Sequence, residues 1–163
     1  MSLKFHKSNT GRAAEAARAV KLLVLDLDGV MTDGGLYYRP DGDTIKRFHV
    51  HDGFGIKIAM DMGIEVAVNT GLKSVSARAR MDRLGINYYV EGQEDKLGPL
   101  DEIRRACGLD WRELAYVGDD WVDLAPMAAS RTMATTMPRL RFFTLIILSN
   151  APGLRPIYSE HAK

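Results

Sequence analysis

The chain lacks the sequence features by which several large classes of protein are recognised. A single cysteine, Cys107, excludes an internal disulfide and a cysteine-based zinc site, and predicts a cytoplasmic location. The formal net charge of +1 gives no electrostatic support for binding nucleic acid or a membrane surface. The longest apolar run, Phe142 to Leu148, is far too short to span a bilayer. The sequence also lacks the G-x-x-x-x-G-K-[ST] pattern of a phosphate-binding loop.

What the chain does contain is typical of one globular domain. A length of 163 residues is enough for a single hydrophobic core. The composition, with 46% hydrophobic and 26% charged residues, fits neither a disordered nor a fibrous protein. We therefore expect one domain over residues 1–163.

Short apolar runs alternate with helical patterns along the chain. Because near-continuous apolar runs fit strands covered on both faces, the order predicts an α/β fold, Rossmann-like, with a central parallel sheet flanked by helices. A β-hairpin with Pro40 and Gly42 in its turn interrupts this order over residues 34–50. The predicted strands are 22–27, 64–69, 86–90 and 114–117, and the predicted helices are 13–20, 53–62, 73–84, 97–107 and one from 122 onward.

Polar side chains follow each predicted strand. They are Asp26 and Asp28 after the first, Thr70 after the second, Lys96 six residues after the third, and Asp119, Asp120 and Asp123 after the fourth. In open α/β sheets ligands bind at the carboxyl ends of the strands, so these groups are expected in one crevice. Clustered carboxylates repel one another, and a hard cation such as Mg²⁺ relieves this. The sequence therefore predicts a Mg²⁺-dependent phosphate site.

The two aspartates after the first strand fit two chemical roles. A carboxylate can attack phosphorus and form an aspartyl-phosphate, which is the role expected of Asp26. Asp28, two residues on, would protonate the leaving alkoxide and then deprotonate the hydrolytic water. Thr70 and Lys96 would supply a hydroxyl donor and a positive charge for the phosphoryl group.

The run from Asp26 to Asp33, DLDGVMTD, resembles the first motif of the haloacid dehalogenase-type phosphatases. Thr70, Lys96 and the run GDDWVD from Gly118 to Asp123 resemble the second, third and fourth motifs, in the same order. The resemblance implies Asp26 as nucleophile, Asp28 as acid and base, and Thr70 and Lys96 as phosphoryl-binding residues. It also implies a metal site formed by Asp26, the main-chain carbonyl of Asp28, and Asp119, with Asp120 and Asp123 orienting metal-bound waters or Lys96.

Members of that superfamily usually carry an inserted cap domain, but the segments between these motifs hold only a hairpin, two helices and a strand. The capless pattern over about residues 20–129 is similar to the 3-deoxy-D-manno-octulosonate 8-phosphate phosphatases, and almost as similar to the 9-phosphate phosphatases of nine-carbon sugar acids. This implies a sugar-acid phosphate monoester as substrate and a homotetramer assembled through hairpin 34–50.

Two features depart from that pattern. Leu72 stands where those families commonly have arginine or glutamate, so the substrate carboxylate needs another partner; Arg80 and Arg83 on the following helix could supply it, and Arg80 is one of the candidate substrate contacts. Thr32, Gly71 and His51 are the other candidate substrate contacts. Residues 130–163 lack the family's glycine-rich tail, and Phe143 to Leu148 could be a fifth strand.

Two rival functions stay open at this stage. A receiver domain also groups carboxylates, a hydroxyl residue and a lysine around Mg²⁺, but the order of its motifs differs. A catalytically weakened regulatory or oligomerisation module would be expected to lose Asp26 or Asp28, and both are present.

Overall fold

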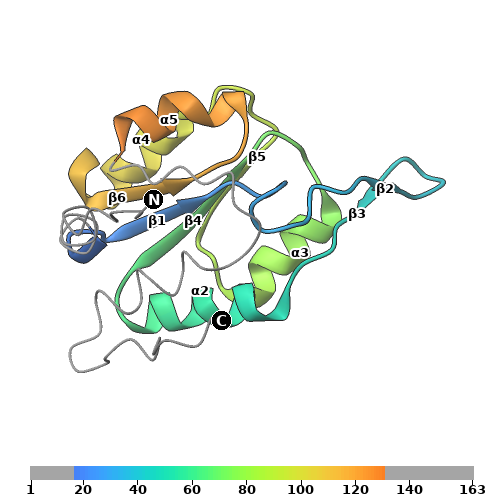
Figure 1. Ribbon diagram of the computed structural model, residues 1–163, viewed down its shortest axis with the longest axis horizontal. Helices are drawn as coiled ribbons and strands as arrows, with labels where there is room; N and C mark the ends of the chain where they lie inside the picture. The colour runs from blue at the N-terminus through green and yellow to red at the C-terminus, as the bar shows by residue number, and fades with distance from the viewer. Residues whose placement is uncertain (1–16, 131–163) are drawn as a thin grey trace, which may run out of the picture.

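A four-stranded parallel sheet forms the centre of the molecule, in the order β5-β4-β1-β6 (Figure 1). The computed structural model describes residues 17–130, and the predicted helix 13–20, tail and fifth strand fall wholly or largely outside them. The strands are β1 (Leu22–Leu25), β4 (Glu65–Thr70), β5 (Tyr88–Glu91) and β6 (Leu114–Val117). The predicted α/β fold with a central parallel sheet is confirmed.

Two helical layers cover the sheet, one on each face (Figure 1). The helices α2 (Val50–Asp61) and α3 (Val75–Leu84) pack on one face, and α4 (Leu97–Ala106) and α5 (Leu124–Ala129) pack on the other. Successive side chains of β1 point to opposite faces of the sheet, so this strand contributes to the hydrophobic core on each face. Leu23 and Leu25 join the cluster under α2 and α3, whereas Leu22 and Val24 join the cluster under α4 and α5. All four are buried, which explains the continuous apolar run in the sequence.

Local capping sets where the helices begin and end. Ser74 accepts a hydrogen bond from the main-chain N–H of Ala77, so α3 begins at Val75 rather than at Lys73 as the sequence predicted. Gly85 ends α3 with a φ of 78°, a left-handed conformation that glycine adopts at little cost. Helix α2 begins at Val50, three residues before the predicted start, because the His49 side chain accepts from the N–H of His51.

The hairpin follows β1 and projects away from the sheet (Figure 1). Its strands are β2 (Tyr37–Tyr38) and β3 (Thr44–Ile45), which pair antiparallel. Leu36, Tyr37, Tyr38 and Ile45 are 50–69% exposed. Between β1 and β4 the chain forms only this hairpin and α2, and between β4 and β5 only α3. Within the described residues the fold therefore has no cap domain.

Two 3₁₀ turns complete the described chain, η1 (Trp111–Glu113) before β6 and η2 (Trp121–Asp123) after it. Asp110 and Glu113 form a capping box at η1. Across residues 17–130 no helix combines the length and the apolar character needed to cross a membrane.

Candidate active site

The order of the strands creates one natural crevice for a ligand. The chain runs from β1 to β4 and β5 on one side, then returns so that β6 pairs with the other side of β1. The direction of winding therefore switches between β1 and β6, and ligands in such sheets bind outside the strand ends at that point. The N–H of Asp26 donates to the carbonyl of Val117 across 2.8 Å, which joins the two strand ends there.

Asp26 lies buried at this point and pairs with Lys96. The Asp26 side chain is 6% exposed, and the Nζ of Lys96 lies 2.8 Å from its Oδ1. Burial raises the pKa of Asp26 to about 7, although the Lys96 ammonium acts in the opposite direction. Burial lowers the affinity of Lys96 for its proton, but Asp123 and Asp26 outweigh that and hold its pKa above the usual range. Lys96 therefore stays charged beside the carboxylate.

Asp123 organises the loop after β6. Its Oδ1 accepts from Lys96 Nζ at 2.7 Å and from the hydroxyl of Tyr116 at 2.7 Å, in a fully buried position. Its Oδ2 accepts from the main-chain N–H groups of Asp119 and Asp120, each at 3.2 Å. With two hydrogen bonds on each oxygen, Asp123 holds both Lys96 and the loop that carries Asp119.

Two glycines let the loops approach this closely. Gly29 has a φ of 84°, and a Cβ there would collide with the carboxylate of Asp119. A Cβ on Gly118 would collide with the side chain of Asp123. The glycines in DLDGVMTD and GDDWVD are therefore needed because backbone and carboxylate meet at both positions.

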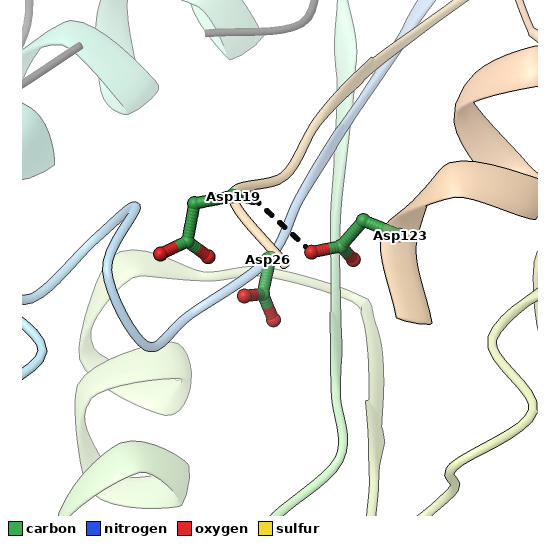
Figure 2. A group of neighbouring side chains, drawn as sticks. All are labelled: Asp26, Asp119 and Asp123. Atoms are coloured by element: carbon green, nitrogen blue, oxygen red, sulfur yellow. Dashed lines mark hydrogen bonds between the residues drawn. The ribbon is translucent and has the colours of Figure 1, made fainter. Parts of the chain in front are cut away.

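The carboxylates are arranged in a way that suits a divalent cation. Asp26, Asp119 and Asp123 each offer an oxygen, and these oxygens lie within 4.8 Å of one another (Figure 2). Loss of hydration, together with the charges of Asp123 and Asp120, raises the pKa of Asp119. Because the Asp123 oxygens already accept four hydrogen bonds, Asp26 and Asp119 are the better direct ligands, and Asp123 supports them from behind. The donor set fits Mg²⁺, which prefers few carboxylates.

The Asp28 side chain points to a different partner. Both of its oxygens accept hydrogen bonds from Lys46 Nζ, at 2.5 and 2.8 Å, and Lys46 comes from the end of the hairpin. The hydroxyl of Thr32 lies 3.5 Å from Asp28 Oδ1. The Asp28 carboxylate is 30% exposed, so it lies at the surface of the crevice while Asp26 lies beneath it.

The remaining predicted residues divide into two groups. Thr70, Gly71 and Lys96 line the same open cleft of ≈ 470 Å³ as Asp26, Asp28, Asp119 and Asp120, and so do Leu72 and Val122. Thr70 is almost fully buried at the end of β4. The structure thus brings all seven predicted catalytic, metal-binding and supporting residues into one site.

Three predicted substrate contacts lie outside the lining of that cleft. The Thr32 hydroxyl accepts from the N–H groups of Gly29 and Gly34 and so holds the turn. Arg80 lies over the ring of Phe48 and donates to the carbonyl of His49 at 3.4 Å. His51 is exposed on the first turn of α2. Their contact with a substrate stays a prediction.

Sequence reasoning missed three residues that shape the site. Lys46 pairs with Asp28, Tyr116 donates to Asp123, and the Asn69 amide donates to the Lys96 carbonyl at 2.8 Å. Asn69 and Tyr116 lie within predicted strands, and an uncharged polar group inside an apolar strand was the signal available for both. Lys46 carried no such signal, because charged residues are common in exposed hairpins.

The parallel sheet, its switch point and the carboxylate–lysine cluster define a class of protein, the haloacid dehalogenase-type hydrolase fold. No family model matches the chain. A Legionella pneumophila protein assigned to subfamily III A of the HAD superfamily is 30% identical, with a TM-score of 0.79 over 88% of this chain and 91% of that one.

Two further relatives narrow the class. The 3-deoxy-D-manno-octulosonate 8-phosphate phosphatase of Haemophilus influenzae is 42% identical over 113 residues, which are 69% of this chain but only 63% of that protein. The Moraxella catarrhalis enzyme of the same name, solved with a magnesium ion, a phosphate ion and KDO, is 33% identical. Its TM-score is 0.71, over 74% of this chain and 69% of that one. The chain therefore belongs to the haloacid dehalogenase superfamily, in the family of the 3-deoxy-D-manno-octulosonate 8-phosphate phosphatases.

The raised pKa of Asp26 predicts how the stability of the metal-free protein depends on pH. Folding raises this pKa from 3.8 to about 7, so the folded state holds a proton that the unfolded chain has lost between those values. The free energy of unfolding should therefore fall as pH rises from about 4 to 7. Asp26→Asn should remove the part of this dependence that Asp26 contributes, leaving the smaller part that comes from the raised pKa of Asp119, and should stabilise the metal-free protein by about 1–4 kcal/mol at pH 8. Urea unfolding in EDTA at pH 5 and pH 8 measures both effects, and equal pH slopes for the two proteins would contradict the prediction.

Proposed function

We propose that this protein is a Mg²⁺-dependent phosphatase that hydrolyses a phosphate monoester through an aspartyl-phosphate on Asp26. The arrangement of Asp26, Lys96 and Asp119 carries the proposal. A buried carboxylate lies between a charged lysine and a second carboxylate, at the edge of a cleft. This gives a nucleophile, a positive charge and two metal ligands in one place, which is the set that phosphoryl transfer needs.

In the first half of the reaction, Asp26 attacks phosphorus. An oxygen of its carboxylate forms the new P–O bond while the ester P–O bond breaks and its electron pair passes to the leaving oxygen. Asp28 lies two residues on, at the cleft surface, and gives a proton to that oxygen. Lys96 and the Thr70 hydroxyl bind the transferring phosphoryl oxygens, and bound Mg²⁺ neutralises part of their negative charge.

In the second half, water releases the phosphate. Asp28, now ionised, accepts a proton from a water molecule whose oxygen attacks phosphorus. The bond from phosphorus to Asp26 breaks, and its electron pair restores the Asp26 carboxylate. Inorganic phosphate leaves, and Asp28 is protonated again for the next turnover. Asp123 holds Lys96 in place through both halves at 2.7 Å.

The substrate we propose is a sugar-acid phosphate, foremost 3-deoxy-D-manno-octulosonate 8-phosphate, with the 9-phosphate of a nine-carbon sugar acid as the alternative. The support comes from the relatives of that name and from the complex of the Moraxella catarrhalis enzyme with KDO. Leu72 and Val122 line the cleft with apolar side chains, so neither recognises a carboxylate.

A panel of phosphate monoesters tests this proposal. We expect Mg²⁺-dependent release of phosphate from p-nitrophenyl phosphate, and a higher kcat/KM for sugar-acid phosphates than for matched sugar phosphates without the carboxylate. The colorimetric assay of phosphate with Mg²⁺ or with EDTA measures both. Equal kcat/KM for the two sugar series would refute the sugar-acid assignment, and no Mg²⁺-dependent release from any ester would refute the phosphatase.

We also propose that the protein is a cytoplasmic homotetramer assembled through hairpin 34–50. The exposed apolar side chains of the hairpin support assembly, because Leu36, Tyr37, Tyr38 and Ile45 are each at least half exposed in the single chain and would be covered by a neighbouring subunit.

A further inference from the structure

The return segment of the hairpin, residues 46–48, is bound to the turn after β1 by three consecutive contacts. Lys46 pairs with Asp28, Arg47 lies 3.2 Å from an oxygen of Asp33, and Phe48 forms a β-bridge with Thr32. The hairpin therefore does more than project from the fold. It also fixes the turn that carries the proposed acid and base.

Lys46 differs from the other cations of the hairpin in its burial. Its side chain is 3% exposed, whereas the side chains of Arg39 and Arg47 are 54% and 66% exposed. Arg39 forms an ion pair with Asp41 in the hairpin turn, and neither residue is among those that line the cleft. A buried ammonium that reaches both oxygens of one carboxylate fixes the orientation of that carboxylate far better than an exposed pair does.

We infer that Lys46 is a positioning residue for Asp28. Lys46 holds the Asp28 carboxylate at the surface of the cleft, where the leaving oxygen departs. This inference rests on the proposed function. Besides Lys46, the described contacts of the Asp28 carboxylate include only a long one, from the Thr32 hydroxyl at 3.5 Å. Loss of Lys46 therefore releases the side chain of Asp28 while the Asp26–Lys96 pair beneath it keeps its own partners.

The effect of losing Lys46 on kcat/KM should depend on the leaving group of the substrate. An alkoxide needs a proton as it leaves, whereas p-nitrophenolate is stable enough to leave without one. The value of kcat/KM reports only the steps up to the first irreversible one, which is formation of the phosphorylated Asp26. It therefore measures the need of the leaving oxygen for a proton separately from the later hydrolysis of the phosphorylated Asp26. We expect Lys46→Met to lower kcat/KM about 10–100-fold for an alkyl phosphate and less than about threefold for p-nitrophenyl phosphate.

The experiment compares Lys46→Met, Lys46→Arg and, as control, Lys21→Met in the full chain with Mg²⁺; Lys21 also pairs with a carboxylate, that of Glu113, but lies outside the hairpin and is 62% exposed. The alkyl substrate is the sugar or sugar-acid phosphate that the wild type hydrolyses fastest, and both esters are assayed on the same preparation, so partial unfolding cancels in the ratio of the two values. Lys46→Arg keeps a cation and should recover most of the wild-type ratio, and Lys21→Met should leave the ratio unchanged. Lys46→Met should also show a burst of p-nitrophenolate, because Asp28 activates water poorly in the second half.

Each outcome decides one question. Equal losses on the two esters, or no loss on either, would overturn the positioning role of Lys46 while leaving the phosphatase intact. A wild type without Mg²⁺-dependent turnover of any ester would refute the proposed function itself, and the inference would fall with it.

Discussion

Asp26→Asn should reduce Mg²⁺-dependent phosphate release from p-nitrophenyl phosphate to the background rate, a loss of at least about 10⁴-fold. The amide is nearly the same size as the carboxylate but cannot attack phosphorus, and it removes one of the two direct ligands that the geometry assigns to the cation. Asp119 and Asp123 should not replace Asp26 as nucleophile, because Asp119 is the other direct ligand and both oxygens of Asp123 already accept hydrogen bonds. Steady-state assays at saturating Mg²⁺, with mass spectrometry for the phosphorylated aspartate, measure the loss.

The control for this variant is Asp101→Asn. Asp101 is also a carboxylate in ion pairs, with Arg104 and Arg105 on α4, but it is not among the residues that line the catalytic cleft. Its substitution should leave turnover unchanged. The Asp26→Asn protein should be folded and, without metal, more stable than the wild type above pH 7, and circular dichroism of the assayed preparation checks that a loss of activity does not come from unfolding. Turnover above background in a folded Asp26→Asn protein would exclude Asp26 as the nucleophile.

The sequence predicted the sheet well because its strands are buried on both faces. Leu22 to Leu25 are all apolar since α-helices cover both sides of β1, and such a run leaves little choice of structure. The buried parallel strands also allowed the position of the site to be predicted. Asp26 and Asp119 each follow a buried parallel strand, so the topology alone brings them to one edge of the sheet.

The start of α2 was harder to predict for a local reason. The sequence prediction began the helix at Gly53, although Gly53 and Gly55 are weak helix formers and mark no clear start. The structure begins it at Val50 because His49 caps it with a ring nitrogen, and histidine is not among the residues that usually mark a helix start. The side-chain geometry, not the hydrophobic pattern, decides this boundary.

Lys46 could not have been assigned from the sequence. It lies 18 residues from Asp28, and the path between them passes out along β2 and back along β3. Whether a lysine in such a hairpin faces solvent or the cleft depends on how the hairpin docks, which the Phe48–Thr32 bridge fixes. Contacts of this kind come from tertiary structure, and no local pattern encodes them.

Asp28→Asn should separate catalysis from metal binding. Turnover of an alkyl phosphate should fall by about 10²–10⁴-fold, because the amide can neither give a proton to the leaving oxygen nor accept one from water. The affinity for Mg²⁺ should stay within about threefold of the wild type, because the Asp28 carboxylate faces Lys46 and is not part of the cluster of Asp26, Asp119 and Asp123. Calorimetric titration with Mg²⁺ and steady-state kinetics on the same protein give the two numbers.

The matched control is Asp33→Asn in the same turn. Asp33 accepts from the exposed Arg47 and from the N–H of Gly35, so its loss disturbs the turn without removing a group from the cleft. We expect less than about a threefold change in its kcat, since exposed ion pairs contribute little. Normal turnover in Asp28→Asn would remove Asp28 from the acid and base role. A parallel loss of Mg²⁺ affinity would instead place its side chain among the metal ligands, which requires the carboxylate to leave Lys46 when the cation binds.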